Sequence, residues 1–310
     1  MPLSRFVNVF AGNPLDRAAE RRSSEDWLDE QRASSEAMAI VLWQGEVLVE
    51  PDAAGGERLA YLRLDMAEQA SGNRAVFLGL WKGAPVFAVD FETGLDPSAG
   101  PLQGLGRFQE MRGAGLLLPG PEAAIAATAK SLIEWHDAHG FCSACGKPSE
   151  PADGGWRRVC PACRVEHFPR VNPVTIMLPV FGDRCLLGRQ AAWPKGRMSA
   201  LAGFLEPGES IEEACARELK EEAGLTAVRV AYHSSQPWPF TSNLMIGLIA
   251  EVDDDDARPD QTELEAVRWF TRDELRRVLD GETGWDGVLP PPRLAIARTL
   301  MQAWVDGFEG

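Results

Sequence analysis

Four cysteines constrain the fold of this chain more than any other feature of its sequence. They form two pairs, Cys142 with Cys145 and Cys160 with Cys163, and each pair has the spacing Cys-x-x-Cys. Two such pairs, separated by 14 residues, predict a tetrahedral Zn²⁺ site with four thiolate ligands, because each pair can form a tight knuckle. A closed shell of four thiolates has no open position for water, so we expect one structural Zn²⁺ per subunit.

The charge and hydropathy of the chain favour zinc over disulfides. No stretch of the 310 residues approaches the length of a membrane span, and the N-terminus lacks the continuous apolar run of a secretory signal. We therefore expect a cytoplasmic, reducing location, with two redox-active cysteine pairs as the alternative to zinc. The net charge of −15 predicts a surface that repels nucleic acid and anionic membranes. The remaining thiols, Cys185 and Cys215, lie among apolar residues and are predicted to be core residues.

The chain divides into three predicted parts, a first domain at 1–135, a zinc ribbon at 136–170 and a last domain at 171–310. The first domain is predicted to be mostly β, with short runs broken by Gly, Pro and Asp before an alanine-rich helix at 122–136. These β-like runs cover residues 46–51, 58–64, 74–81 and 84–91.

The last domain is predicted to be α+β with largely antiparallel strands. Gly182 and Asp183 are typical of a hairpin turn between its first two strands. The predicted strands cover residues 174–181, 184–190, 228–236, 244–252 and 266–270, and helices are predicted at 272–280 and 292–305. This order differs from the alternating series of a doubly wound parallel sheet. The acidic run Asp253–Asp256 is predicted to be a solvated turn.

A further helix in this domain carries clustered carboxylates. Ser210 is a good N-cap with Glu213 completing a capping box, and Gly224 is typical of a helix end. The glutamates of the sequence RELKEEAGL lie on one arc about 100° wide, and they are Glu218, Glu221 and Glu222. Like charges at this spacing repel by a few tenths of a kcal/mol per pair, about as much as a salt bridge there would stabilise. A solvated acidic face is the simpler interpretation of such a helix, and a bound divalent cation is the alternative.

The longer stretch GFLEPGESIEEACARELKEEAGL, residues 203–225, resembles the Nudix box at every fixed position. The resemblance implies an α/β/α sandwich with a mixed sheet, and hydrolysis of a nucleoside diphosphate linked to another group. It also implies that Mg²⁺ or Mn²⁺ is held by the three glutamates, which are the expected catalytic residues, together with the carbonyl of Ala202. Arg217 is expected to pair with Glu209 and brace the loop.

A second motif, SSQPWPFTSNLM at Ser234–Met245, narrows the substrate. Pro237 and Pro239 flank Trp238, which excludes a helix or a central strand and predicts a stiff loop. Taken alone, this stretch is most simply a packing loop. Together with the zinc site and the box, it resembles the NADH pyrophosphatase family of Nudix enzymes, whose pattern is SQPWPFPxS. Thr241 replaces the third proline of that pattern, and Asn243 replaces its last serine.

This resemblance implies hydrolysis of NADH or NAD⁺ to nicotinamide mononucleotide and AMP by a homodimer, with a divergent N-terminal domain. It implies that Glu263 is a further metal ligand, while Gly155 replaces a glutamate that often contacts substrate in the family. The implied substrate-binding residues are Arg112, Phe168, Phe204, Gln236, Pro237, Trp238, Pro239, Phe240, Thr241, Ser242, Asn243 and Ala297.

Three other functions fit parts of the sequence. The same chemistry can remove a 5′ NAD cap from RNA, and the ribbon carries an arginine cluster for an RNA backbone, formed by Arg157, Arg158, Arg164 and Arg170. A broader hydrolase of ADP-ribose or dinucleoside polyphosphates would use the same box. A non-enzymatic zinc module that binds nucleic acid would leave the clustered glutamates without a role.

Overall fold

The computed structural model describes residues 7–72, 75–281 and 285–308. The chain forms two compact units. We call Val9–Val171 with Trp238–Ser242 the N-terminal unit, and Met1–Asn8 with Asn172–Pro237 and Asn243–Gly310 the C-terminal unit. The N-terminal unit includes the zinc ribbon, and the three-part division at 135 and 170 stays a prediction.

A mixed sheet forms the centre of the N-terminal unit. Its strands follow the order β3-β2-β1-β6-β5, with β4 paired to β1 and β7 paired to β2. The bounds are β1 Met38–Trp43, β2 Glu46–Pro51, β3 Glu57–Leu59, β4 Leu62–Arg63, β5 Val76–Trp81, β6 Ala84–Asp90 and β7 Arg107–Gln109. The prediction of one strand at 58–64 was wrong, because the chain leaves β3 at Leu59, pairs again as β4 and enters a helix at Leu64.

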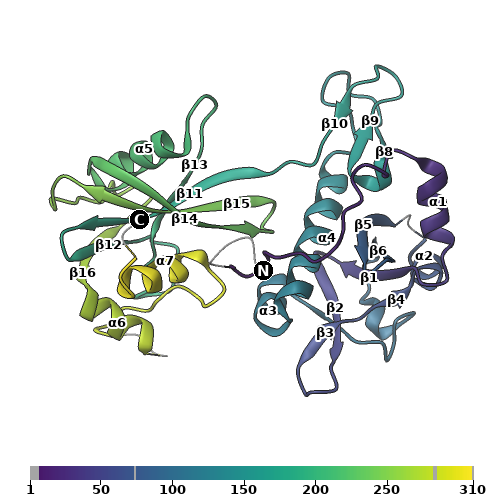
Figure 1. The fold of residues 1–310 in the computed structure, drawn as a ribbon, viewed down its shortest axis with the longest axis horizontal. Coiled ribbons are helices and arrows are strands. Elements are labelled where there is room, and N and C mark those ends of the chain that lie inside the picture. Colours follow the sequence, from purple (N-terminus) through teal and green to yellow (C-terminus); the bar gives the residue numbers. More distant parts are fainter. Residues whose placement is uncertain (1–6, 73–74, 282–284, 309–310) are drawn as a thin grey trace. The chain divides into compact units, whose positions relative to one another are not determined.

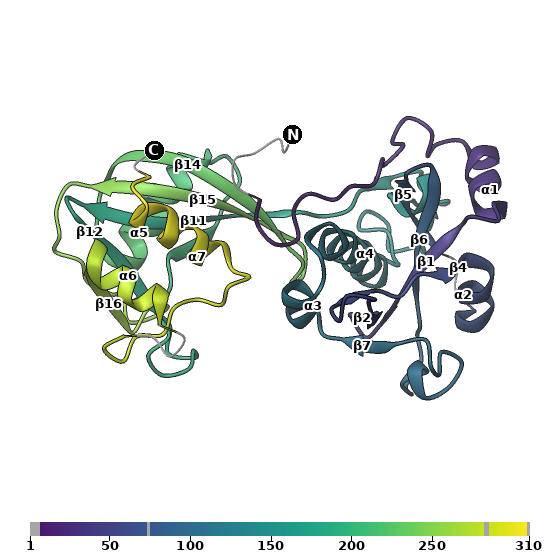
Figure 2. The same ribbon diagram turned by 60° about the horizontal axis from the view of Figure 1, so that its bottom comes forward.

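Helices cover this sheet (Figure 2). The alanine-rich prediction is confirmed by α4 (Gly120–Ala138), which buries most of its alanines together with Ile125, Leu132 and Trp135. The sequence interpretation missed α1 (Glu25–Ala33), α2 (Leu64–Ser71) and α3 (Met111–Leu117), and it also missed the short turns η1 (Pro97–Ala99) and η2 (Asp153–Gly155). The ribbon adds a three-stranded antiparallel sheet in the order β10-β9-β8, with β8 Glu150–Ala152, β9 Arg157–Val159 and β10 Glu166–His167.

The C-terminal unit is a sheet between two layers of helix (Figure 1). The strand order is β14-β15-β11-β12-β16, with β13 paired to β11; β11 and β15 run parallel, whereas β12 and β13 each run antiparallel to β11. The bounds are β11 Asn172–Phe181, β12 Arg184–Arg189, β13 Leu201–Phe204, β14 Ala227–Trp238, β15 Asn243–Val252 and β16 Ala266–Thr271. The predicted hairpin at Gly182 is confirmed by the pairing of Phe181 with Arg184.

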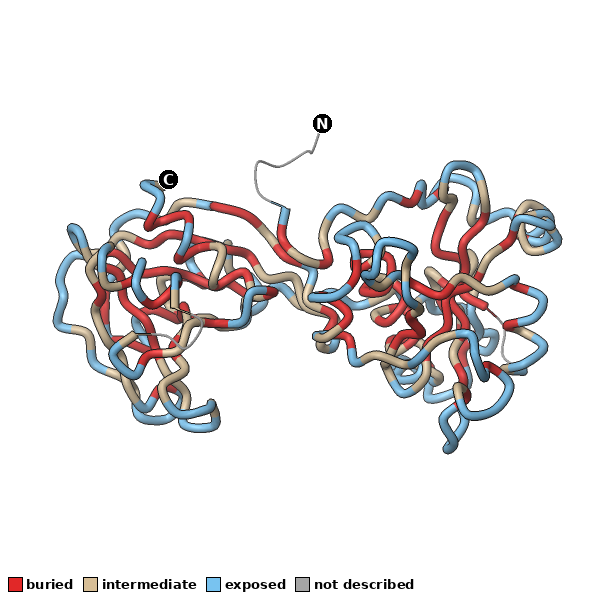
Figure 3. The backbone as a smooth tube through the Cα atoms, turned by 90° about the horizontal axis from the view of Figure 1, so that it is seen from below, coloured by how far each residue is buried: buried red, intermediate tan, exposed pale blue. Residues whose placement is uncertain are grey.

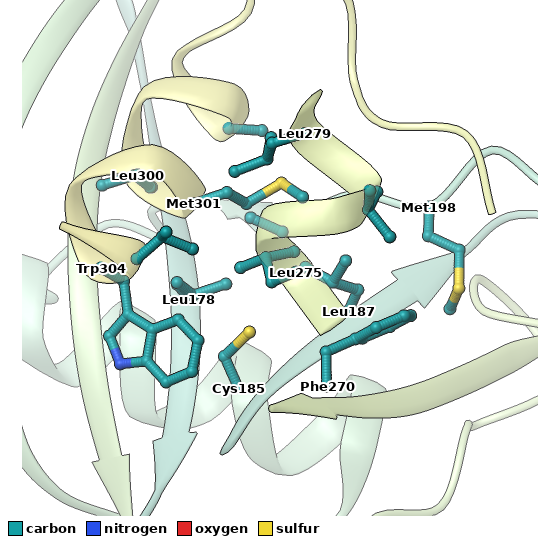
Figure 4. Close-up of a cluster of buried hydrophobic side chains, with 14 of the residues drawn as sticks. Leu178, Cys185, Leu187, Met198, Phe270, Leu275, Leu279, Leu300, Met301 and Trp304 are labelled. Atoms are coloured by element: carbon teal, nitrogen blue, oxygen red, sulfur yellow. The ribbon is translucent and has the colours of Figure 1, made fainter. Parts of the chain in front are cut away.

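One apolar cluster lies on each face of this sheet. Figure 4 shows the cluster beneath α6 (Arg272–Asp280) and α7 (Ile296–Val305), where Trp304 and Phe270 lie on either side of Cys185. The opposite cluster packs α5 (Ile211–Ala223) on the sheet through Cys215. Both thiols are fully buried, as predicted. In Figure 3, buried residues gather in the interior of each unit, and the central strands β1 and β11 consist mostly of such residues.

Two predicted boundaries were wrong near prolines. Helix α7 begins at Ile296 and not at 292, because the prolines at 290–292 hold that segment outside the helix. Strand β14 continues past the predicted end at Gln236 to Pro237 and Trp238, where a loop was predicted. Strand β14 lies at the edge of its sheet and, among the strands of the described residues, pairs with β15 alone. Proline has no backbone N–H to donate, and an edge strand tolerates this because only one of its sides needs hydrogen bonds to a neighbouring strand.

Candidate active site

Helix α5 positions the clustered carboxylates, and its ends are fixed as the sequence predicts. The Ser210 hydroxyl accepts the Glu213 amide at 3.2 Å, and the Glu213 carboxylate accepts the Ser210 amide at 2.7 Å. Gly224 ends the helix with a φ of 74°, a conformation that glycine adopts without a steric penalty. These two caps fix the start and end of the helix, and therefore the register of its three glutamates.

The three glutamates differ in their surroundings. Glu218 and Glu222 are only 8% and 3% exposed, whereas Glu221 points to solvent. The Oε2 atom of Glu222 is buried and has no hydrogen-bond partner within the described parts of the chain. A buried carboxylate oxygen without a donor costs free energy unless it neutralises or coordinates a cation. This donor set therefore fits a hard divalent metal, which prefers carboxylate oxygen.

Strand β13 brings backbone directly against these carboxylates. A Cβ atom added to Gly203 would lie 1.8 Å from the carboxyl carbon of Glu218, so any other residue here would displace that carboxylate. Gly203 and Ala202 pair with Thr175 and Ile176 of β11, which fixes the strand. The backbone of Ala202 also hydrogen bonds Glu222. Metal binding by the Ala202 carbonyl stays a prediction, and the close approach of this strand to Glu218 and Glu222 is compatible with it.

Arg217 connects the loop to the helix, and it does more than the sequence predicted. Its guanidinium donates to Glu209 at 2.6 and 2.9 Å and to the Phe204 carbonyl at 2.9 Å. It also reaches Glu218 at 2.8 Å and Glu221 at 3.0 Å. The hydrogen bonds from Arg217 to Glu209 are the main cause that lowers the pKa of the Glu209 carboxyl to about 2. In the protein chain alone, Arg217 therefore supplies part of the positive charge that the glutamates require.

The electrostatics of the site centre on Glu222. Burial is the main cause that raises the pKa of Glu222 to about 8, and the negative charges of Glu218, Glu263 and Asp260 contribute to the same shift. Burial also raises the pKa of Glu218, although Arg217 opposes this shift. The predicted fourth ligand Glu263 is thus close enough to influence both buried carboxyls. Asp260 was not predicted, because its role depends on the path of a loop and not on a local motif.

The pH dependence of stability follows from the raised pKa of Glu222. Its proton stabilises the folded protein fully below the ordinary value of 4.5, and that stabilisation is lost as the pH rises through about 8. One such group contributes a slope of at most about 1.4 kcal/mol per pH unit. We expect zinc-loaded wild type without Mg²⁺ or Mn²⁺ to lose more stability than Glu222→Gln between pH 5.5 and 8.5, as measured by urea unfolding. Parallel pH profiles for the two proteins would contradict the assignment.

The four ribbon cysteines converge in the N-terminal unit. Among the described residues, their Sγ atoms all lie within 4.8 Å of one another, with Cys142 and Cys163 at 3.6 Å and Cys145 and Cys160 at 3.5 Å. Zn–S bonds of about 2.3 Å place tetrahedral sulfurs roughly 3.8 Å apart, close to these distances. Both knuckles share one backbone pattern, since Gly146 donates to the Cys142 carbonyl at 2.9 Å and Arg164 to that of Cys160 at 2.8 Å. The geometry fits Zn²⁺.

Gln236 of the second motif is a fully buried brace. Its amide nitrogen donates to the Leu294 carbonyl at 2.7 Å, and its amide oxygen accepts the Ile296 amide at 2.9 Å. Since Ala295 caps α7 without a side-chain bond, Gln236 supplies the first turn of α7 with an acceptor from a distant strand. Ala297, which follows in that turn, is buried. The substrate contacts of Gln236 and Ala297 stay predictions.

The aromatic residues of the motif pack within the N-terminal unit. Phe10 meets Trp238 and Phe240 edge-on, with ring centroids 6.3 and 6.2 Å apart, and the guanidinium of Arg112 lies 3.9 Å from the Phe240 centroid. One face of Phe240 is therefore covered by Arg112. The predicted ligand contacts of Arg112 and of the other residues of this tip stay untested, and these residues are Pro237, Trp238, Pro239, Phe240, Thr241 and Ser242.

Three further predicted contact residues, besides Gln236 and Ala297, lie outside that tip. Phe204 in the C-terminal unit and Phe168 in the N-terminal unit are 56% and 63% exposed, so both rings are available for stacking. Asn243 accepts the side-chain amide of Asn172 at 3.1 Å, where β15 pairs with β11. Asn243 thus already bonds the strand beside it, whereas the two phenylalanines present open faces.

Comparison with known proteins decides the family. The description "NUDIX domain" matches residues 171–289, "NADH pyrophosphatase-like rudimentary NUDIX domain" matches 36–135, and "NADH pyrophosphatase zinc ribbon domain" matches 137–168. The NAD-capped RNA hydrolase NudC of Mycobacterium bovis is 37% identical over 297 residues, which is 91% of this chain and 93% of that protein. This chain belongs to the NADH pyrophosphatase family of Nudix hydrolases.

Two animal proteins are similar to this Nudix hydrolase as well. The human mitochondrial NAD(P)H pyrophosphatase NUDT13 is 42% identical over 216 residues, covering 65% of this chain and 60% of that protein. The NAD-capped RNA hydrolase NUDT12 of Macaca fascicularis is 34% identical over 347 residues, covering 96% of this chain and 73% of that protein. Across the described parts of the Nudix hydrolase, no helix has the length and apolar character needed to cross a bilayer.

The arginine cluster predicted on the ribbon of this Nudix hydrolase was wrong for Arg158, which is buried, whereas the contact predicted for Arg157 stays a prediction. Arg158 is buried and donates to Ser149 and His136, and Arg157 pairs with Asp153 and Glu166. Their charges are used inside the ribbon, because β9 turns both side chains toward neighbouring acceptors.

Proposed function

We propose that this Nudix hydrolase cleaves the pyrophosphate bond of NADH or NAD⁺ to give nicotinamide mononucleotide and AMP, using Mg²⁺ or Mn²⁺. The observation that supports it most is the buried Glu222 carboxylate in a complete Nudix box, because its Oε2 atom has no hydrogen-bond partner among the described residues and Glu218 adds a second buried carboxylate. The human relative is named an NAD(P)H pyrophosphatase, which favours a nicotinamide dinucleotide as substrate. A non-enzymatic nucleic-acid module gives no reason for a buried carboxylate cluster.

The residues of the chain divide the work. Glu218, Glu221, Glu222, Glu263 and the Ala202 carbonyl would hold the divalent ions. Bound Mg²⁺ or Mn²⁺ supplies charge neutralisation of the diphosphate and a water of lowered pKa. Arg217 braces the loop, since it bonds Glu209 and the Phe204 carbonyl at once. The exposed Phe204 ring offers a stacking face for a base or a nicotinamide ring.

We extend the proposal to the rest of the molecule by family likeness. Phe168, Arg112 and the 236–243 segment would contact the dinucleotide, and two copies of the chain would form a homodimer. The ribbon would hold one structural Zn²⁺ per subunit, in the cytoplasm, where thiolates stay reduced. The proposed domains are 1–135, 136–170 and 171–310.

The proposal is tested by following AMP release from NADH, NAD⁺ and ADP-ribose with Mg²⁺ or Mn²⁺ added to zinc-loaded enzyme. We expect metal-dependent release of AMP, with a higher kcat/KM for the nicotinamide dinucleotides than for ADP-ribose. A mixture with neither ion is the control. Absence of AMP from NADH and NAD⁺ with both metals would overturn the proposal, and preference for ADP-ribose would favour the broader hydrolase.

Removal of an NAD cap from RNA is the second candidate, because two relatives carry that name. Arg164 and Arg170 remain exposed on the ribbon and have the charge to contact a phosphate backbone. Including a 5′-NAD-capped oligonucleotide in the same assay separates the candidates. Turnover of the capped RNA that falls with salt, while turnover of NADH does not, favours the RNA.

A further inference from the structure

The exposed Glu263 lies on a segment without regular structure. The chain leaves β15 at Val252 and enters β16 at Ala266, and no helix or strand forms between them. Glu263 is nevertheless close enough to Glu218 and Glu222 to influence the ionisation of both carboxyls. A carboxylate on an irregular loop can serve a metal site only if the loop backbone is held in place.

Asp260 provides that hold through its side chain. Its carboxylate accepts the Glu263 amide at 3.0 and 3.2 Å and the Leu264 amide at 2.9 Å. Both oxygens of Asp260 therefore face the backbone of the turn that carries Glu263. Hydrogen bonds from amides to a charged carboxylate are among the stronger ones in proteins, so this turn is fixed from within.

The same segment is attached to the end of α5. The Asp260 amide donates to the Glu222 carbonyl at 3.2 Å, and the Arg258 amide donates to the Ala223 carbonyl at 2.9 Å. On its other side, Leu264 is buried in the apolar cluster beneath α5. The backbone amide of Asp260 is thus bonded to the carbonyl of the buried Glu222, and its side chain is bonded to the backbone amide of the exposed Glu263.

We infer that Asp260 is a positioning residue that fixes Glu263 relative to Glu218 and Glu222 and thereby raises the affinity of the site for divalent cations. This inference rests on the proposed metal-dependent function, but only on its metal-binding part. The competing account is that the charge of Asp260 attracts the cation directly. The two accounts differ because asparagine keeps an acceptor oxygen for both amides while it removes the charge.

The test is a double-mutant cycle read by direct Mn²⁺ binding, with free Mn²⁺ measured by electron paramagnetic resonance on zinc-loaded full-length protein. The variants are Asp260→Ala, Asp260→Asn, Glu263→Gln and the combination of Asp260→Ala with Glu263→Gln. Asp256→Ala is the matched control, since it removes an equal charge from the same segment without touching the turn. Thermal unfolding of each variant shows whether it is folded.

We expect Asp260→Ala to weaken Mn²⁺ binding by roughly tenfold or more, as changes to residues behind metal ligands do. Glu263→Gln should weaken Mn²⁺ binding similarly. The double variant should bind Mn²⁺ no more weakly than Glu263→Gln alone, because both changes remove the same contribution, that of a correctly placed Glu263 carboxylate. Asp260→Asn and Asp256→Ala should bind like wild type.

Three results would overturn the inference. They are additive losses in the combination, wild-type binding by Asp260→Ala, and a loss in Asp260→Asn equal to that in Asp260→Ala. If Asp260→Ala does not fold, Asp260→Asn and Glu263→Gln still decide between the two accounts. If wild type binds Mn²⁺ but releases no AMP from any dinucleotide, the proposed function fails while the cycle still decides the role of Asp260.

Discussion

Glu222→Gln should lower kcat on NADH by roughly two to four orders of magnitude while the fold stays intact. The carboxylate of Glu222 is buried, one of its oxygens has no hydrogen-bond partner in the part of the chain that the structure describes, and glutamine cannot supply a second anionic oxygen to a metal. The variant should also bind Mn²⁺ more weakly. Steady-state release of AMP and the Mn²⁺ titration measure the two effects independently.

The stability of the variant distinguishes a catalytic role from a structural one. Since burial and three neighbouring carboxylates destabilise ionised Glu222, a neutral glutamine should unfold at the same temperature as wild type or a higher one near pH 8. Glu212→Gln is the matched control, because Glu212 is exposed in the first turn of the same helix. A Glu222→Gln enzyme with full activity would remove the basis for the active site.

Helix α5 was predictable because its determinants are local. The two ends of the helix are set by Ser210, Glu213 and Gly224 through hydrogen bonds to residues only a few positions away. Such local capping patterns can be recognised from the sequence alone. The same holds for the cysteine knuckles, where two residues between ligands fix the turn. The resemblance of these local patterns to the NADH pyrophosphatase family then predicted the fold and the reaction.

The differences among the three glutamates were not predictable, because they depend on what the sheet places against the helix. Gly203 on β13 lies against Glu218, and Glu222 is enclosed, while Glu221 one position earlier remains in solvent. The role of Asp260 was not predicted for the same reason, since its hydrogen-bond partners are Glu263 in an irregular turn and Glu222 near the end of α5. Helical spacing alone predicts that the three glutamates lie on one side of α5, but it does not predict how deeply each of them is buried.

The motif around Gln236 shows a second limit of sequence reasoning. The pattern of prolines and aromatics predicted substrate contacts, which stay untested, but it did not predict that Gln236 is hydrogen bonded to the backbone at the start of α7 or that Arg112 covers one face of Phe240. In the ribbon, Arg158 is likewise a residue type that often binds phosphate, but here it is buried and hydrogen bonded to Ser149. Side chains with several donors serve both purposes, so composition did not separate them.

Loss of zinc should destabilise the N-terminal unit and leave the metal site on α5 intact. The ribbon is bonded to the rest of that unit, since the Trp156 indole donates to the Phe77 carbonyl at 2.7 Å and His136 contacts the Gly155 carbonyl at 2.8 Å. Gly155 also packs so closely that a Cβ atom there would lie 2.8 Å from Val76. These contacts require a folded ribbon, and structural Zn²⁺ contributes about 10–16 kcal/mol in isolated zinc-finger peptides.

Cys160→Ser tests this dependence, because it removes one buried thiolate from the four. We expect faster hydrogen exchange across the ribbon and β5, a lower unfolding temperature, and a lower zinc content as measured by atomic absorption. Ser143→Ala, in the first knuckle but outside the ligand set, should retain zinc and exchange like wild type. Mn²⁺ binding should be unchanged in both variants, because every predicted ligand of that site belongs to the C-terminal unit. Unaltered exchange at β5 in zinc-free protein would show that the ribbon folds without its metal.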